Sequence, residues 1–166
     1  MNVRRFIESG AAVLAAFLAF TLLQRIHPLA VEAVNVFVVV VLLIGLTGGE
    51  IAGAVMGAVC GLVADSFSLG IFGIAGIGLT TMGFFTGFIS RKINVLRTPR
   101  LFLFFALLSA AELGLWAAAT ALVFGRGAPW SGGVVLLQPV LNALTATVLF
   151  EGSRRWKFRH DRTIDL

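Results

Sequence analysis

Four glycines and an acid follow one another at four-residue intervals in the middle of the chain: Gly49, Gly53, Gly57, Gly61 and Asp65, which we call the glycine ladder. Residues four apart lie on one face of an α-helix, so the glycines predict a smooth, slowly drifting helix face. Glycine weakens a helix in water, whereas between membrane helices it lets a neighbouring backbone approach closely. The pattern therefore predicts a packed bundle of membrane helices that holds an acid near one membrane surface.

The composition supports the same class of protein. Hydrophobic residues make up 58% of the 166 residues and charged residues 13%, and the mean hydropathy is +0.98. Soluble domains carry about 25% charged residues. At about 20 residues per crossing, six crossings with short loops use nearly the whole chain. We therefore expect one integral membrane domain over residues 1–166, with no separate catalytic domain.

The apolar runs predict an all-α, polytopic bundle of six transmembrane helices, at about 6–23, 33–47, 49–64, 70–89, 101–124 and 134–152. With the N-terminus inside, the cytoplasmic segments hold eleven of the thirteen Lys and Arg residues, and the outer loops hold Arg25 and Arg126. This asymmetry follows the positive-inside rule and predicts that both termini are cytoplasmic. It also explains the net charge of +5 without nucleic acid. A cleaved signal peptide is the less favoured alternative for the first run, because its removal would leave five spans.

Residues 33–64 form one apolar run, which we predict to contain two helices. Residues 33–64 carry a single charge, Glu50. One continuous helix over this range would be about 48 Å long at about 1.5 Å per residue, which exceeds a hydrocarbon core of ~30 Å. We therefore predict a tight cytoplasmic turn at Thr47, Gly48 and Gly49, between two short helices.

Three of the predicted spans present small residues for close helix contact. They are Ala11, Ala15 and Ala19 in the first span, Gly49, Gly53, Gly57 and Gly61 in the third, and Gly73, Gly76, Gly83 and Gly87 in the fourth. Such faces serve either packing inside the bundle or docking of a partner's transmembrane helix. The first span is the candidate for partner docking.

Polar side chains inside membrane spans are functional candidates by default. Glu112 lies near the middle of the fifth span, and Asn142 near the middle of the antiparallel sixth, one turn from Gln138. An ionised carboxylate at that depth is costly, so Glu112 is expected to be neutral or paired. We predict a hydrogen-bonded cluster of these three residues. Structural cohesion, a proton or substrate site, and contact with a partner helix are its alternative roles.

Asp65 and Ser68 lie in the predicted turn between the third and fourth spans. Either side chain, or that of Ser66, can accept hydrogen bonds from the first amides of the next helix. Capping of this turn is the favoured interpretation of Asp65, and recognition of a molecule at the outer face is the alternative.

Catalytic signatures are missing from the sequence. No His, Cys and carboxylate residues have the spacing of metal ligands, and no Gly-Lys-Ser/Thr follows the glycines to form a phosphate loop. We expect no enzyme activity, no cofactor and no metal.

The stretch from Gly61 to Gly73 resembles the family of the bacterial rod shape-determining protein MreD. That family carries a Gly-x-x-x-Asp-x-x-Ser stretch followed by small residues and a further glycine, which Gly61, Asp65, Ser68 and Gly73 match in place. Asn142 fits a polar Asn in the family's last span. Leu69 follows the serine where the family often has Gly, and Gly70 comes one step later.

The resemblance implies a non-catalytic component of the cell-elongation complex in the bacterial inner membrane. Its partners would be MreC, with one membrane helix and a periplasmic domain, the actin-like MreB, the RodA glycosyltransferase and a class B penicillin-binding protein. The family's fold is thought to be similar to the S components of energy-coupling factor vitamin transporters. A small-molecule carrier subunit is therefore the alternative function, although the outer loops offer few of the convergent polar groups that a vitamin pocket needs.

Overall fold

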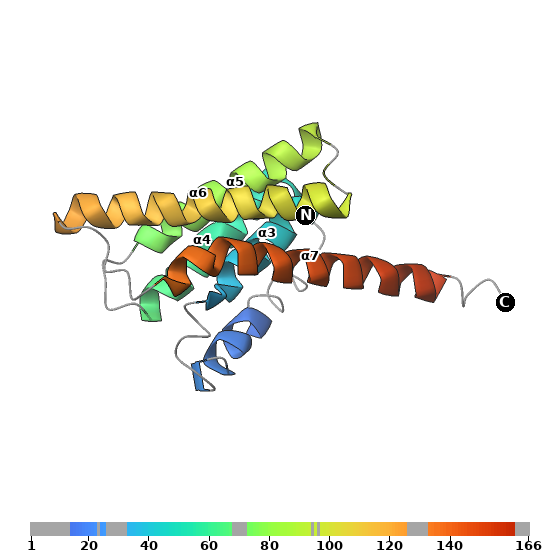
Figure 1. Ribbon diagram of the computed structural model, residues 1–166, viewed down its shortest axis with the longest axis horizontal. Helices are drawn as coiled ribbons and strands as arrows, with labels where there is room; N and C mark the ends of the chain where they lie inside the picture. The colour runs from blue at the N-terminus through green and yellow to red at the C-terminus, as the bar shows by residue number, and fades with distance from the viewer. Residues whose placement is uncertain are drawn as a thin grey trace.

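The computed structural model describes residues 14–22, 24–25, 33–67, 73–93, 95, 97–125 and 133–161, with side chains in the last range to residue 155. All regular secondary structure in these ranges is helical. Five helices follow a helical segment over residues 14–22: α3 Val36–Gly48, α4 Glu50–Phe67, α5 Ile74–Lys92, α6 Thr98–Phe124 and α7 Val134–Asp161 (Figure 1).

Three of the described helices are long and apolar enough to cross a membrane: Glu50–Phe67, Thr98–Val123 and Val134–Arg155. Helix α3 is apolar but has only 13 residues. Helix α5 has 19 residues, among them four glycines, three threonines and the terminal pair Arg91 and Lys92. The predicted all-helical membrane class is therefore confirmed, with three helices that meet the requirements for a span on their own.

The predicted helix limits differ from the observed limits mainly at the ends. Helix α4 extends three residues beyond the predicted end at 64, and α6 begins three residues before the predicted start at 101. The sixth span is predicted to end at about 152, and helix α7 continues beyond that point through the basic segment to Asp161. Once the chain leaves the apolar layer, hydropathy no longer reports where a helix ends.

The predicted turn between the second and third spans is confirmed. Helix α3 ends at Gly48, and Gly49 has a φ of +88°, with its N–H donating to the Gly45 carbonyl at 3.0 Å. Helix α4 begins at the next residue, Glu50. Gly49 therefore forms the turn, and its predicted place within the glycine face of a helix is corrected: its positive φ is a backbone conformation that glycine adopts without steric cost.

The second predicted span does not begin at Ala33. Ala33 is helical, but Val34 and Asn35 are not, and α3 starts at Val36. Asn35 has extended backbone angles, and its side chain accepts hydrogen bonds from the amides of Phe37 and Val38 at 3.1 and 3.3 Å. Asn35 is therefore an N-cap that stops the helix from extending backwards.

The helices pair in antiparallel fashion. Asp65 near the end of α4 bonds to Gly73 before α5, while Glu50 at the start of α4 contacts Arg91 at the end of α5. Thr98 at the start of α6 likewise donates to Glu151 of α7 at 2.8 Å. These contacts place the Gly49 turn, the end of α5 and the start of α6 together at one end of the bundle.

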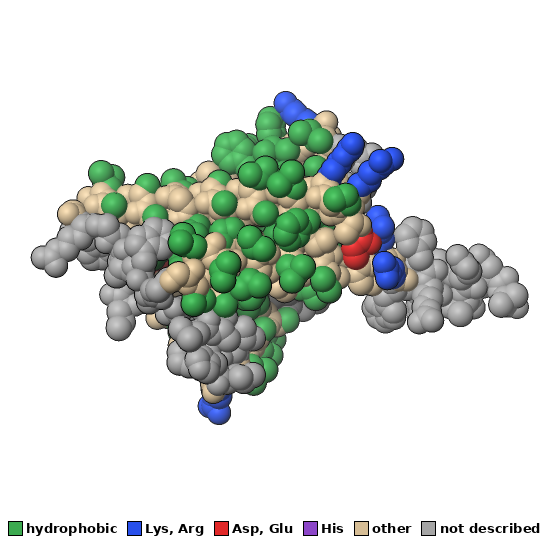
Figure 2. All heavy atoms as spheres, in the orientation of Figure 1, with side chains coloured by type: hydrophobic (Ala, Val, Ile, Leu, Met, Phe, Trp, Pro, Cys, Tyr) green, Lys and Arg blue, Asp and Glu red, His purple; other side chains and the backbone are tan. Residues whose placement is uncertain are grey.

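The cationic side chains gather at this same end, which we call the basic end. Figure 2 shows most of the Lys and Arg side chains at this end, with a separate cationic group at the bottom of the view. The described members of the basic end are Arg91 and Lys92 of α5, Arg97 and Arg100 at the start of α6, and Arg154 and Arg155 of α7.

Helix α3 lies at the centre of the bundle and contacts α4, α5 and α7. Its side chains form much of the buried core: Phe37, Val38, Val39, Val41 and Leu42. The outer faces of the surrounding helices are also apolar. Their exposed members include Ile51 and Val55 of α4, Leu103 and Leu107 of α6, and Leu136, Leu144 and Val148 of α7. A bundle that is apolar both inside and outside suits a lipid environment.

Candidate functional site

The Asp65 carboxylate crosses the turn between α4 and α5 and caps the start of α5. Its Oδ2 accepts hydrogen bonds from the amides of Gly73 at 2.9 Å and Gly76 at 3.1 Å, and its Oδ1 accepts one from Ala75 at 3.1 Å. The side chain is buried, with 6% of the residue exposed. An anionic acceptor at a helix N-terminus satisfies free amides and complements the helix dipole. The expected capping interaction of Asp65 is therefore confirmed.

The two serines predicted for the same turn do not share this role as far as they are described. The Ser66 hydroxyl donates to the Leu62 carbonyl of its own helix at 2.8 Å. Ser68 lies outside the described residues. Gly73, predicted as part of a helix face, instead precedes α5 with a φ of +108°. A Cβ at Gly73 would meet nothing within 4 Å, so its backbone angle is what requires glycine here.

The glycine faces of α4 and α5 pack against each other through their backbones. A Cβ at Gly53 would clash with the Gly83 carbonyl, and a Cβ at Gly83 would clash with the Gly53 carbonyl. One turn further along, a Cβ at Gly57 would clash with the Leu79 carbonyl and lie 2.7 Å from the Thr80 Cα. The two faces therefore serve packing within the chain.

The ends of this interface are equally close. A Cβ at Gly61 would clash with the backbone of Gly76, and a Cβ at Gly87 would clash with the Gly49–Glu50 peptide. Gly76 itself has more room, because its own Cβ would lie 3.7 Å from Asp65 Oδ2, an ordinary contact. The α4–α5 pair is thus a hairpin in direct backbone contact along its length.

The small residues of the first helix point in different directions. Ala15 is exposed and Ala19 is half-buried, whereas Ala16 is buried in the core. Ala11 lies outside the described residues. This helix also makes aromatic contacts: Phe17 and Phe20 pack against Phe67 at the end of α4, with ring centroids 5.5 and 5.8 Å apart. Ala15 is therefore not used for packing against the described helices.

Asn142 joins three helices in the centre of the bundle. The residue is fully buried, and its Nδ2 donates to the Ser109 hydroxyl of α6 at 3.0 Å. Its Oδ1 accepts a hydrogen bond from the backbone amide of Asn35 at 2.9 Å. Ser109 lies eleven residues after the start of α6, which is about 16 Å along the helix. The start of α3 therefore lies well inside the bundle, where the polar groups of the interrupted backbone are satisfied by protein.

The predicted cluster of Glu112, Gln138 and Asn142 is not formed. Glu112 is buried, with 7% exposed, but its carboxyl lies beside Gly78 of α5, and no described residue donates a hydrogen bond to it. Gln138 is half-buried and makes no hydrogen bond with Asn142. The reason is rotation about the axis of α6: Glu112 lies three positions after Ser109, which turns their side chains about 60° apart. Ser109 faces α7, and Glu112 faces α5.

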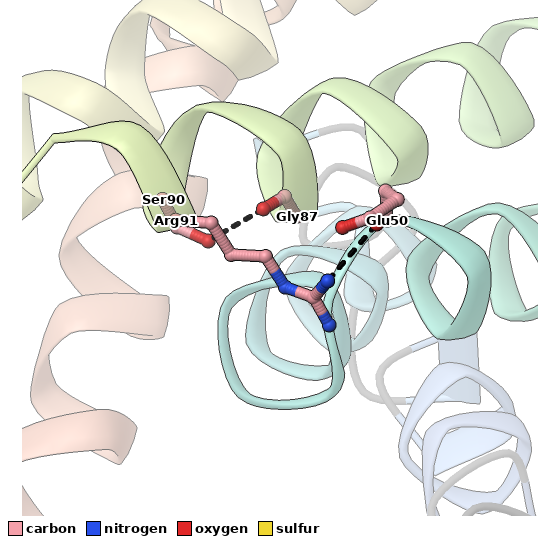
Figure 3. A network of polar contacts seen from close by, with 4 residues as sticks. All are labelled: Glu50, Gly87, Ser90 and Arg91. Atoms are coloured by element: carbon pink, nitrogen blue, oxygen red, sulfur yellow. Dashed lines mark hydrogen bonds and ion pairs between the residues drawn. The ribbon is translucent and has the colours of Figure 1, made fainter.

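An ion pair joins α4 and α5 at the basic end, opposite the Asp65 turn. Arg91 Nη1 contacts Glu50 Oε1 at 2.9 Å, as Figure 3 shows, and the Ser90 hydroxyl donates to the Gly87 carbonyl at 3.0 Å. The side chains of Arg91 and Glu50 are 60% and 27% exposed. A Cβ at Gly49 would clash with the Arg91 guanidinium, so the turn glycine leaves room for this cation.

Asn35, Ser109 and Arg91 are the contributors that our sequence analysis missed. Asn35 had a usable signal, because Asn directly before an apolar run is a favoured N-cap. Ser109 had none, because serine is common in membrane helices and often bonds to its own backbone. The partner of Glu50 was likewise hidden, since Arg91 is 41 residues away.

The described polar groups are suited to holding helices together. Among the described residues, no group of three or more His, Cys, Asp or Glu side chains could hold a metal ion. Comparison with protein-family models, with curated proteins and with solved structures finds no match for this chain.

Proposed function

We propose that this chain is a non-catalytic scaffold of the bacterial inner membrane, of the MreD type. In this proposal it crosses the membrane six times with both termini in the cytoplasm, in a helix arrangement similar to that of S components. It docks the transmembrane helix of MreC and so couples the MreB filament inside to the wall synthases RodA and a class B penicillin-binding protein outside.

The observation that carries the proposal is the geometry of the Asp65 turn. The stretch that resembles the family begins with Gly61 against the backbone of α5, continues with Asp65 on the first amides of α5, and ends with the left-handed Gly73. Each of these three residues makes a contact or adopts a backbone angle that depends on its residue type. The motif therefore acts as one structural unit, which supports a resemblance beyond composition.

The exposed face of the first helix supports a docking role. Leu14, Leu18 and Leu22 are 54–61% exposed, and the small residue Ala15 lies among them. The glycine faces of α4 and α5 pack against each other. Among the predicted small-residue surfaces, the exposed face of the first helix is therefore the one that the described helices leave open. A small residue beside leucines allows close approach of another membrane helix.

Affinity purification of the tagged protein from its native membranes in mild detergent tests the proposal. We expect mass spectrometry to identify a single-span periplasmic coiled-coil protein, and Ala15→Trp to abolish its recovery. Ala118→Trp, which enlarges an exposed alanine of α6, is the matched control and should retain the partner. Recovery of two ATPases and a coupling membrane protein would instead identify a carrier subunit and refute the scaffold.

A further inference from the structure

One side of α5 carries a lysine at the basic end of the bundle and two aromatic rings further along the helix. Phe84, Phe88 and Lys92 are four residues apart and form a stripe on one side of the helix. The Phe84 and Phe88 rings are stacked with centroids 5.9 Å apart, and Lys92 Nζ lies 4.3 Å from the Phe88 centroid. Both rings are exposed, at 40% and 39%.

The cation at the head of this stripe lacks an acidic partner. Among the described residues of the basic end, Glu50 pairs with Arg91 and Glu151 pairs with Arg154. Lys92 makes no ion pair with a described acid. Arg97 and Arg100, which follow within eight residues, and Arg155 of α7 are likewise exposed without a described acidic partner. The basic end thus has an excess of positive charge directly above an apolar surface.

We propose that the Phe84–Phe88–Lys92 stripe binds an anionic phospholipid. Its order along the helix axis matches the polarity of such a lipid: the cation at the surface meets the phosphate, and the two rings one and two turns deeper lie along an acyl chain. Cations just outside a membrane span attract anionic headgroups, and the Phe88 ring attracts the Lys92 ammonium group to this side of the helix. This inference does not depend on the proposed scaffold function.

Native mass spectrometry of the purified chain tests the assignment. The detergent-solubilised protein is titrated with an equal mixture of phosphatidylglycerol and phosphatidylcholine of the same chain length. We expect preferential retention of phosphatidylglycerol and a loss of about fivefold in Lys92→Gln, equivalent to about 1 kcal/mol for one cation at the headgroup layer. Arg25→Gln removes an exposed cation that follows the helical segment 14–22. This control variant should retain phosphatidylglycerol as well as the unmodified protein does.

Two further arms separate the possible sources of the negative charge. Glycerol phosphate, which has the headgroup chemistry without acyl chains, should not displace the bound lipid at equal concentration, and Phe88→Leu should weaken retention of the lipid. Equal retention of the two lipids, equal effects of Lys92→Gln and Arg25→Gln, or displacement by glycerol phosphate would overturn the assignment. Gel filtration of each variant shows that it remains folded.

Discussion

Asn142 on α7 holds the backbone amide of Asn35 at 2.9 Å, although the two residues are 107 positions apart in the chain. The bond pins the residue before α3 to the apolar part of α7, and the Ser109 hydroxyl on α6 completes the junction at 3.0 Å. A short helix can begin inside an apolar bundle because the amide that precedes it is satisfied there.

Replacement of Asn142 by Leu should therefore destabilise the bundle by about 1–3 kcal/mol, because it leaves the partly buried Asn35 amide without its hydrogen-bond partner. Unfolding followed by tryptophan fluorescence in detergent micelles measures the change. Gln138→Leu on the same helix is the control, with an expected effect of about 0.5 kcal/mol or less. Equal losses in the two variants would contradict the assigned role of Asn142.

Asp65 variants should separate acceptor geometry from side-chain size. Asp65→Asn retains one oxygen, which can still serve Gly73 and Gly76, whereas Asp65→Leu removes all three hydrogen bonds. We expect a loss of about 2 kcal/mol or more for Leu and a clearly smaller loss for Asn. The same fluorescence assay measures both. Loss of partner recovery in both variants at normal stability would instead indicate a role for the charge itself.

Gly57→Ala should destabilise the α4–α5 hairpin, because its new methyl group would strike the Leu79 carbonyl. Overpacking of this kind costs about 1–3 kcal/mol. Gly114→Ala on α6 is the matched control: its Cβ would meet nothing within 4 Å, and alanine is the better helix former. The thermal midpoint of Gly57→Ala should fall, and that of Gly114→Ala should stay level or rise. A fall of equal size in both would disprove the close backbone packing.

The Glu50–Arg91 pair should contribute little to stability despite its 2.9 Å separation. The Arg91 side chain is 60% exposed, and exposed ion pairs contribute about 0–1 kcal/mol because water and salt screen them. A double-mutant cycle with Glu50→Gln and Arg91→Gln measures the coupling energy. A value well above about 1 kcal/mol would show that the pair is shielded from water in the membrane.

The sequence predicted local features better than contacts between helices. The glycine repeat from Gly53 to Gly61 and the turn at Gly49 are visible within a few positions of the chain, and the Asp65 cap joins residues only 8 to 11 positions apart. The partner of Asn142 depends on how α6 is rotated about its axis. Helix α6 has apolar residues on all of its faces, so the hydrophobic periodicity does not reveal that rotation. Glu112 was therefore expected, in place of Ser109, as the partner of Asn142.

The backbone contact between α4 and α5 also bears on how the protein enters its membrane. Alone, α5 is not among the described helices that are apolar enough to span, because its glycines, its threonines and the terminal Arg91 and Lys92 lower its mean hydropathy. Its glycines also leave backbone surface that side chains do not cover. Gly53 and Gly57 of α4 cover that surface. We therefore expect the two helices to integrate as a pair during synthesis, with α5 inserting poorly when α4 is omitted from a glycosylation-reporter fusion; equal insertion with and without α4 would refute this dependence. The glycine ladder would then act during biogenesis, before any partner is met.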